Sequence, residues 1–293
     1  MRHLHAISQK LESFNPDSPE MPKHAILSHV WGKEEVTFEH IGNLPKARRT
    51  LSFEKVRLSC VQTKRDGLRY VWVDTCYIDK SSSSELSEAI NSMFKWYQNA
   101  PVCYAYLRTT TTLGILENGD PLEDFVNSKW LTRGWTLQQL IVPRVVEFYS
   151  RSWFHLGSRY ILRKEISLVT GIPERVLRNP KTIKTYSVAT RMSWASARNT
   201  TRPEDRVYSL LGFFYVHMPL LYGEGKRAFI RLQEEIIKSS DDETILAWDG
   251  DLPCWLPILH RFSILPMWNR CLLGVSPQSI QLPTRAIRCT YPC

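Results

Sequence analysis

Four short apolar runs alternate with helical patterns over the first 150 residues. The runs cover residues 25–30, 70–74, 102–107 and 145–149. Each has the length and the continuous hydrophobicity of a buried parallel strand. Strands that alternate with helices predict a parallel sheet with right-handed crossovers. We therefore expect an α/β fold, in which a parallel sheet flanked by helices occupies residues 1–150.

Two of the stretches between these runs have the period of amphipathic helices. Residues 52–66 predict a helix that ends at Gly67, because glycine readily adopts the backbone conformation that closes a helix. Residues 82–97 predict a second helix with one apolar face. The spacing of Ser82 and Glu85 at its start is that of a capping box.

The pattern becomes mainly helical after residue 150. Helical periodicity recurs over residues 164–176, 185–197 and 224–239. These helices have too little apolar surface for a core of their own, so we expect residues 151–249 to form a helical layer packed on the sheet. Prolines interrupt residues 250–293, which predicts an irregular tail.

The composition is that of a globular protein without a membrane span. The chain has 293 residues, of which 43% are hydrophobic and 23% are charged. No apolar run approaches the roughly 20 residues that cross a bilayer, and residues 1–23 lack the pattern of a secretory signal. We expect a cytoplasmic protein. The 7 cysteines include no Cys-x-x-Cys pair, so we expect neither a disulfide framework nor a metal site.

The net charge of +9 raises the hypothesis of a nucleic-acid partner. Phe53, Val56 and Cys60 fall at helical spacing within the most basic segment, which favours a solvated helix face over a binding surface. No nucleic-acid reading motif accompanies the charge, so we expect no such partner. The basic residues concerned are Lys46, Arg48, Arg49, Lys55, Arg57, Lys64 and Arg65.

Ligands of open parallel sheets bind beyond the carboxyl ends of the strands. This places residues 28–33, residues 74–80 and the loop after Leu107 on one rim. Asp74 and Asp79 lie in the second of these segments, and paired carboxylates there can act as acid and base or bind a metal. Alternatively, Asp74 orders its loop and Asp79 serves the next helix N-terminus.

Residues 128–140 form the densest cluster of aromatic and polar side chains. They include Trp130, Arg133, Trp135 and the adjacent amides that end with Gln139. Aromatic groups with polar atoms are costly to bury unless each polar atom has a partner. The cluster is therefore either a satisfied corner of the core or the wall of a pocket.

Other segments have simpler interpretations. Residues 28–32 lack the flanking glycines of a nucleophile elbow, so we interpret His29 as structural. Residues 221–226 lack the P-loop spacing and predict a tight turn into a helix. Residues 202–206 carry both signs of charge and predict a local ion-pair network. In the last helix, the expected i,i+4 pairs are Arg231–Glu235 and Glu234–Lys238.

The order of these segments is more specific than any one of them. Residues 25–32, 71–80, 84–93, 133–140 and the block 194–248 closely resemble, in sequence order, the fungal heterokaryon incompatibility (HET) domain. The resemblance implies a role in fungal non-self recognition, in which HET-domain proteins trigger the death of fused incompatible cells.

The HET domain is in turn distantly similar to TIR domains, which implies a TIR- or flavodoxin-like sheet. Some TIR domains cleave NAD, with a glutamate in a pattern similar to Trp-x-x-x-Glu-Leu. Relatives commonly have glutamate where this chain has Gln139. A carboxylate stabilises the positive charge that develops on the ribose, and losing such a group commonly costs about 10²–10⁴ in rate. The amide of Gln139 therefore argues against cleavage.

The resemblance implies a substrate pocket and leaves three hypotheses open. The pocket would consist of Ser28, Trp31, Arg133 and Trp135, with Asp74, Asp79 and the degenerate position Gln139 as catalytic candidates. No cofactor is implied, and NAD would be a substrate. The chain is then an effector or regulator of incompatibility, an NAD glycohydrolase, or a catalytically silent module. The silent module would bind protein partners, including copies of its own domain.

Overall fold

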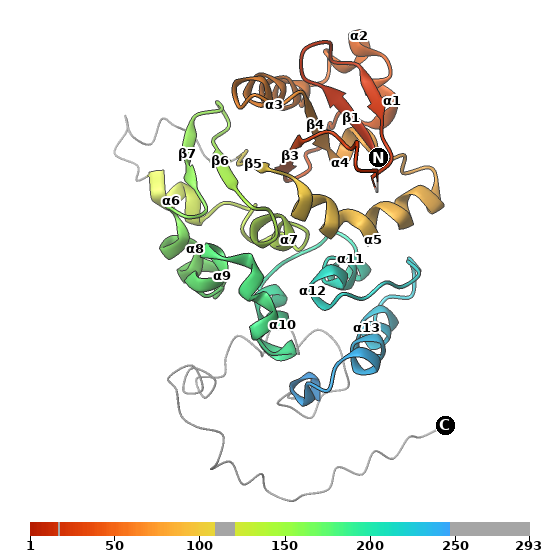
Figure 1. Cartoon of the computed structure of the whole chain (residues 1–293), viewed down its shortest axis with the longest axis vertical. Helices are drawn as coiled ribbons and strands as arrows, with labels where there is room; N and C mark the ends of the chain where they lie inside the picture. The colour runs from red at the N-terminus through yellow and green to blue at the C-terminus, as the bar shows by residue number, and fades with distance from the viewer. Residues whose placement is uncertain (17, 109–120, 247–293) are drawn as a thin grey trace, which may run out of the picture.

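A computed structural model describes residues 1–16, 18–108 and 121–246. Its centre is a sheet of seven strands in the order β2-β1-β4-β3-β5-β6-β7 (Figure 1). The four inner strands, β4, β3, β5 and β6, are parallel neighbours. The strands are β1 (Arg2–His5), β2 (Leu11–Ser13), β3 (His24–His29), β4 (Tyr70–Val73), β5 (Val102–Tyr106), β6 (Val146–Tyr149) and β7 (His155–Ser158).

The inner strands confirm the predicted α/β class. The parallel part of the sheet begins with β3, adds β4 on one side, and then crosses back to add β5 and β6 on the other side. This is the strand order of the flavodoxin-like sheets. The direction of winding changes between β3 and β5, and ligands of such sheets bind in the crevice beyond the strand ends at that point.

The edges of the sheet differ from the prediction of a wholly parallel sheet. β1 pairs antiparallel with β2 and with β4, and β7 pairs antiparallel with β6. The sheet is therefore mixed. β1, β2 and β7 have three or four residues each, which is too few for a pattern of alternation to distinguish them from loops.

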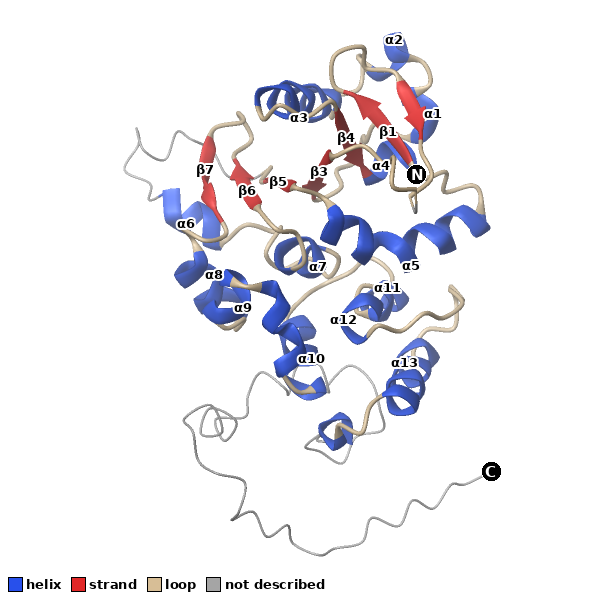
Figure 2. Ribbon diagram, in the orientation of Figure 1, coloured by secondary structure: helices blue, strands red, loops and turns tan. Residues whose placement is uncertain are grey.

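Helices cover the two faces of the sheet separately (Figure 2). α3 (Phe53–Arg65) contacts β3 and β4 from one face. On the other face, Trp72 of β4 packs edge-on against Trp96 and Tyr97 of α5 (Ser83–Asn99). α7 (Thr136–Ile141) lies beside α5 and contacts β3.

The remaining helices of the first half are short. They are α1 (Phe38–Ile41), α2 (Leu44–Ala47), α4 (Asp74–Tyr77) and α6 (Pro121–Val126). At the start of α5, the Ser82 hydroxyl accepts a hydrogen bond from the Glu85 amide, as half of the predicted capping box requires. The other half is absent, because the Glu85 carboxylate instead accepts from Arg2 and from the Asp79 amide.

A helical layer lies beneath α5 and α7 (Figure 1). Phe213 of this layer packs edge-on against Phe94 of α5. The predicted helix over 164–176 is interrupted at Gly171, whose φ of 68° ends α8. The layer comprises α8 (Arg163–Thr170), α9 (Glu174–Arg178), the 3₁₀ helix η2 (Pro180–Thr185), α10 (Val188–Ser196), α11 (Pro203–Tyr208), α12 (Leu211–Phe214), α13 (Arg227–Ser239) and the 3₁₀ helix η3 (Glu243–Leu246).

The predicted ion pairs of α13 are wrong. Arg231 bonds to Glu224 in the preceding loop, and Lys238 bonds to Glu235 at i,i+3 spacing. Glu224 attracts Arg231 because its side chain is only 10% exposed, and an ion pair is screened less there than on an open helix surface.

Some predictions concern residues that the structure does not describe. Cys60, Cys76 and Cys103 are buried free thiols. The other four cysteines and the expected tail over 250–293 lie outside the described residues. Among the helices that are described, none is long and apolar enough to cross a membrane.

Candidate functional site

A cavity of about 340 Å³ lies at the carboxyl ends of the inner strands. Its walls come from the segments after β3 and β4, from α5 and α7, and from residues 201–222 of the helical layer. The lining residues are His29, Val30, Trp31, Asp74, Ile78, Lys80, Leu86, Ile90, Met93, Arg133, Trp135, Thr136, Gln139, Thr201, Arg202, Asp205 and Tyr222.

The structure brings most of the residues proposed from sequence to this cavity. The ones that line it are Trp31, Asp74, Arg133, Trp135 and Gln139. Ser28 is fully buried behind the wall, and Asp79 is not among the lining residues. The Asp79 carboxylate accepts from the amide and the hydroxyl of Ser81, so it orders the turn before α5.

Position 139 ends a chain of buried hydrogen bonds. The indole Nε1 of Trp130 donates to Ser28 Oγ at 2.8 Å. Ser28 Oγ donates in turn to Gln139 Oε1 at 2.5 Å. Since the Trp130 donor occupies Ser28 from one side, the serine hydrogen points at the side-chain oxygen of residue 139. Such a donor suits a carboxylate oxygen as well as an amide oxygen.

Buried arginines fix the two ends of the segment that carries Gln139. The Arg198 guanidinium donates to the Arg133 carbonyl at 2.9 Å and to Thr136 Oγ1 at 3.0 Å, just before and at the start of α7. The Arg159 guanidinium donates to the carbonyls of Leu140 and Ile141, both at 2.7 Å, at the end of α7. Burial lowers the pKa of Arg198 to about 9 and that of Arg159 to about 10.

Asp74 lies at the first position of α4, directly after β4. It is 7% exposed. Its Oδ2 accepts from the indole Nε1 of Trp31 at 2.9 Å. Trp31 is half-exposed, and the Lys80 ammonium lies 3.3 Å from the centre of its ring. Burial lowers the pKa of Lys80, while the nearby carboxylates of Asp74 and Glu35 oppose that shift.

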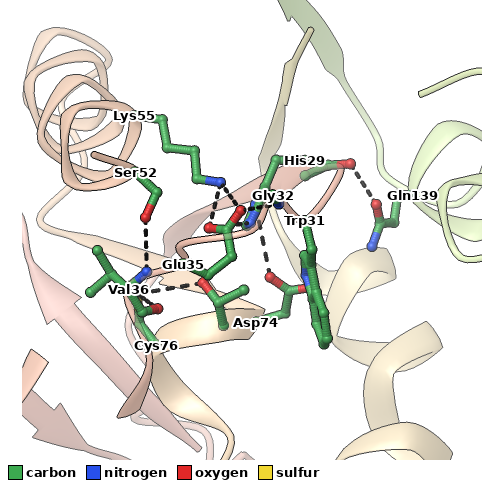
Figure 3. A network of polar contacts seen from close by, with 12 residues as sticks. His29, Trp31, Gly32, Glu35, Val36, Ser52, Lys55, Asp74, Cys76 and Gln139 are labelled. Atoms are coloured by element: carbon green, nitrogen blue, oxygen red, sulfur yellow. Dashed lines mark hydrogen bonds and ion pairs between the residues drawn. The ribbon is translucent and has the colours of Figure 1, made fainter. Parts of the chain in front are cut away.

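Behind Asp74, basic and acidic side chains alternate in the order His29, Glu35 and Lys55 (Figure 3). His29 Nδ1 lies 3.8 Å from Asp74 Oδ1, and His29 Nε2 lies 3.5 Å from Glu35 Oε2. Lys55 Nζ lies 2.6 Å from the same Glu35 oxygen. Burial alone would raise the pKa of Glu35, but the neighbouring His29 and Lys55 lower it to about 2.

One sequence interpretation needs correction here. Lys55 was expected on a solvated helix face, yet it is 6% exposed and paired with Glu35. Its partner lies in the loop after β3, so the periodicity of the helix carries no sign of the pair. His29, which we interpret as structural from the sequence, is buried in the wall of the cavity.

The C-terminal wall of the cavity comes from two segments that enclose Glu204. One Glu204 oxygen accepts from the backbone amides of Gly223 and Gly225 at 3.0 and 2.9 Å. Both glycines have positive φ, which lets the turn wrap around the carboxylate. The predicted turn over 221–226 is therefore present.

The predicted ion-pair network over 202–206 is wrong. Asp205 accepts from the Tyr222 hydroxyl at 2.9 Å, and Arg206 donates to the backbone carbonyls of Ser196 and Arg198. Burial raises the pKa of Asp205. These charged groups therefore bond to neutral partners.

Sequence reasoning missed the contribution of residues 201–222 to the cavity. Arg202 stacks over the Tyr222 ring, with its guanidinium carbon 4.5 Å from the ring centre, and both residues line the wall. No local pattern relates these residues to the strand ends. Among the described residues, no group of three or more His, Cys, Asp or Glu side chains is arranged to hold a metal ion.

Comparison with known proteins identifies the family. Residues 24–117 match the family model described as heterokaryon incompatibility protein (HET). Over 226 residues the chain is 49% identical to the vegetative incompatibility protein HET-E-1 of Podospora anserina. The chain carries a HET domain. This confirms the family that the ordered motifs of the sequence resemble.

The similarity has defined limits. It covers 75% of this chain and 16% of HET-E-1, so the chain spans about a sixth of that relative. No solved structure matches this HET domain. The family model ends at residue 117, so Arg133, Gln139 and the C-terminal wall of the cavity lie beyond it.

Proposed function

We propose that this HET-domain chain acts in vegetative incompatibility, where it promotes the death of fused cells that differ genetically. The 49% identity to a vegetative incompatibility protein over 226 residues carries the proposal. We place the chain in the cytoplasm of the fused cells, with protein partners that include other HET domains. The cavity at the strand ends is the part of the domain that we expect the death response to need.

Induced expression in a filamentous fungus tests this function. We expect induction to reduce the viability of the cells, measured by dye uptake and colony growth. Lys80→Ala removes a charge from the cavity wall and should weaken the effect, whereas Lys129→Ala changes an exposed lysine outside the cavity and should not. Normal growth of cells that accumulate the wild-type protein would contradict the proposal.

The lining of the cavity favours NAD as its ligand. Lys80, Arg133 and Arg202 supply the positive charges that phosphates need. Trp31 and Trp135 supply aromatic surface for the flat rings. Small-molecule sites commonly lie at the strand ends of sheets with this strand order. We infer that the HET domain binds NAD here, either to cleave it or to respond to it.

Position 139 separates cleavage from silent binding. Gln139 lines the cavity and engages Ser28 through its neutral amide. An uncharged group does not stabilise the positive charge that develops on the ribose when the bond to nicotinamide breaks. We therefore favour a silent module that binds NAD and associates with active relatives.

Gln139→Glu is expected to raise the rate of NAD cleavage by about 10² or more, because it restores a carboxylate that Ser28 can hold. Nicotinamide release from purified protein measures the rate. Gln139→Asp is the matched control, since its carboxylate is one methylene too short to reach Ser28. If neither the wild type nor Gln139→Glu consumes NAD, the cleavage hypothesis fails. If the wild type already does, the domain is not silent.

A further inference from the structure

We propose that Lys55, Glu35 and His29 form a buried charge chain that holds Asp74 as the anionic anchor of the cavity. The charge chain is defined as these four side chains in the order Lys55, Glu35, His29 and Asp74. In it, Asp74 touches the ligand and the other three are positioning residues. The inference rests on the proposed NAD site for the identity of the ligand, but the chain itself can be tested without one.

One carboxylate oxygen of Asp74 has no hydrogen-bond partner among the described residues. Trp31 donates to its Oδ2, but its Oδ1 is buried and has no hydrogen-bond partner among the described residues. A buried carboxylate oxygen without compensation is costly. His29 Nδ1 is 3.8 Å from this oxygen, which is beyond a hydrogen bond and within the range of an ionic contact.

Glu35 lies on the side of the His29 ring that faces away from Asp74. Its side chain is 0% exposed, and both ring nitrogens lack hydrogen-bond partners among the described residues. The carboxylates of Glu35 and Asp74 lie on its two nitrogen sides, at 3.5 and 3.8 Å. The ring therefore lies between the two carboxylates, so its position determines where Asp74 can lie.

Lys55 anchors the far end of the charge chain. It contacts both Glu35 oxygens, at 2.8 and 2.6 Å. The Gly32 amide also donates to Glu35, which fixes the carboxylate against the loop after β3. Burying a lysine costs free energy unless it is paired, so Lys55 is committed to Glu35 and is not free to leave the chain.

The charge chain crosses from one face of the sheet to the other. Lys55 belongs to α3, whereas α5 and α7 supply the apolar floor and Gln139 of the cavity on the opposite face. The crossing takes place at the carboxyl end of β3, of which His29 is the last residue. A change at Lys55 should therefore be felt in the cavity without any direct contact (Figure 3).

Asp74 and Asp205 are the two carboxylates among the lining residues. Asp205 accepts from the Tyr222 hydroxyl, whereas Asp74 Oδ1 has no hydrogen-bond partner among the described residues and is available to a ligand. The cations of the wall suit phosphates, so Asp74 suits the cationic or hydroxyl-bearing part of the same ligand. The ligand class is thus a phosphorylated molecule that also carries a positive ring or a ribose diol.

The indole N–H resonance of Trp31 reports on Asp74 in the absence of ligand, because it donates to that carboxylate. It is assigned among the 10 tryptophans by its loss in Trp31→Phe. We expect His29→Gln to move this resonance upfield. The double variant Lys55→Met with Glu35→Gln should move it as well, while it leaves no unpaired charge that would unfold the protein.

A matched pair on the same helix supplies the control. Glu54 and Arg57 form an exposed ion pair on α3, and Glu54→Gln with Arg57→Met should leave the Trp31 resonance in place. An unmoved resonance in both His29→Gln and the Lys55/Glu35 double variant would overturn the charge chain, whatever the ligand.

Calorimetric titration with NAD tests the anchor separately. We expect Asp74→Asn to weaken NAD binding about tenfold or more, since it removes a charge-assisted contact. His29→Gln should weaken it by a smaller factor, and Asn–Trp31 hydrogen bonding should persist. If NAD does not bind the wild type while the Trp31 resonance responds as expected, the NAD site fails and the charge chain stands. If NAD binds equally to the wild type and to Asp74→Asn, the anchor role is refuted.

Discussion

Arg159→Met should lower the free energy of unfolding by about 3–5 kcal/mol, because backbone carbonyls lose their donor and each such loss costs roughly 1–3 kcal/mol. The Arg159 side chain is buried and donates to three backbone carbonyls, those of Leu140, Ile141 and Arg144. Methionine fills the same space but donates nothing, so three carbonyls at the end of α7 lose their donor. Urea denaturation followed by tryptophan fluorescence measures the change.

Arg178→Met provides the matched control, because Arg178 is exposed at the end of α9. A surface arginine typically contributes within about 0.5 kcal/mol, so this variant should unfold with nearly the wild-type midpoint. Equal midpoints for Arg159→Met and Arg178→Met would show that the end of α7 does not depend on Arg159. Since Gln139 belongs to α7, we also expect Arg159→Met to weaken NAD binding.

Acid should destabilise the HET domain steeply through His3 and its neighbour His24. Both rings are buried, and their centroids lie 4.3 Å apart. Burial, the charge of His24 and the N-terminal ammonium lower the pKa of His3 to about 2, and burial also lowers the pKa of His24. The unfolded chain therefore binds these protons near pH 6.5, whereas the folded chain does not.

The sign follows from proton linkage. The folded state binds fewer protons than the unfolded state between pH 6.5 and the folded pKa values, so stability falls as the pH falls through that window. His3 alone contributes up to about 1.4 kcal/mol per pH unit, or roughly 2–3 kcal/mol by pH 4.5. In His3→Phe, the free energy of unfolding should lose about this much less on acidification from pH 6.5 to 4.5, and Tm should depend less steeply on pH. His217→Phe, at an exposed histidine, should leave the slope unchanged; an identical slope for His3→Phe would exclude this origin of acid sensitivity.

The inner strands could be predicted because burial on both faces makes them continuous apolar runs. Ile26 and Leu27 of β3 face opposite sides of the sheet, and both are fully buried. β1 and β7 are strands of four residues with polar positions, and β1 pairs with β4, which is distant from it in sequence. The hydrophobic pattern of the sequence could therefore predict only the parallel strands at the centre of the sheet.

The same distinction separates the two halves of the site. The rim segments around Trp31 and Asp74 could be placed together, since parallel strands bring their carboxyl ends to one edge. Tyr222 reaches the cavity through the hydrogen bonds that Glu204 makes to a glycine turn, 19 and 21 residues away in sequence. Lys55 is buried because Glu35 is nearby in space. Contacts of this kind have no period and leave no local signature.

The origin of the cavity wall bears on how minimal fragments of this family should be judged. A fragment that ends at residue 150 keeps Asp74 and Gln139 but lacks Arg202, Asp205 and Tyr222. It also lacks Arg159 and Arg198, which fix the two ends of the segment that carries Gln139. A fragment of that length would therefore have an incomplete binding site. A lack of activity in the fragment would not show that the intact domain is inactive.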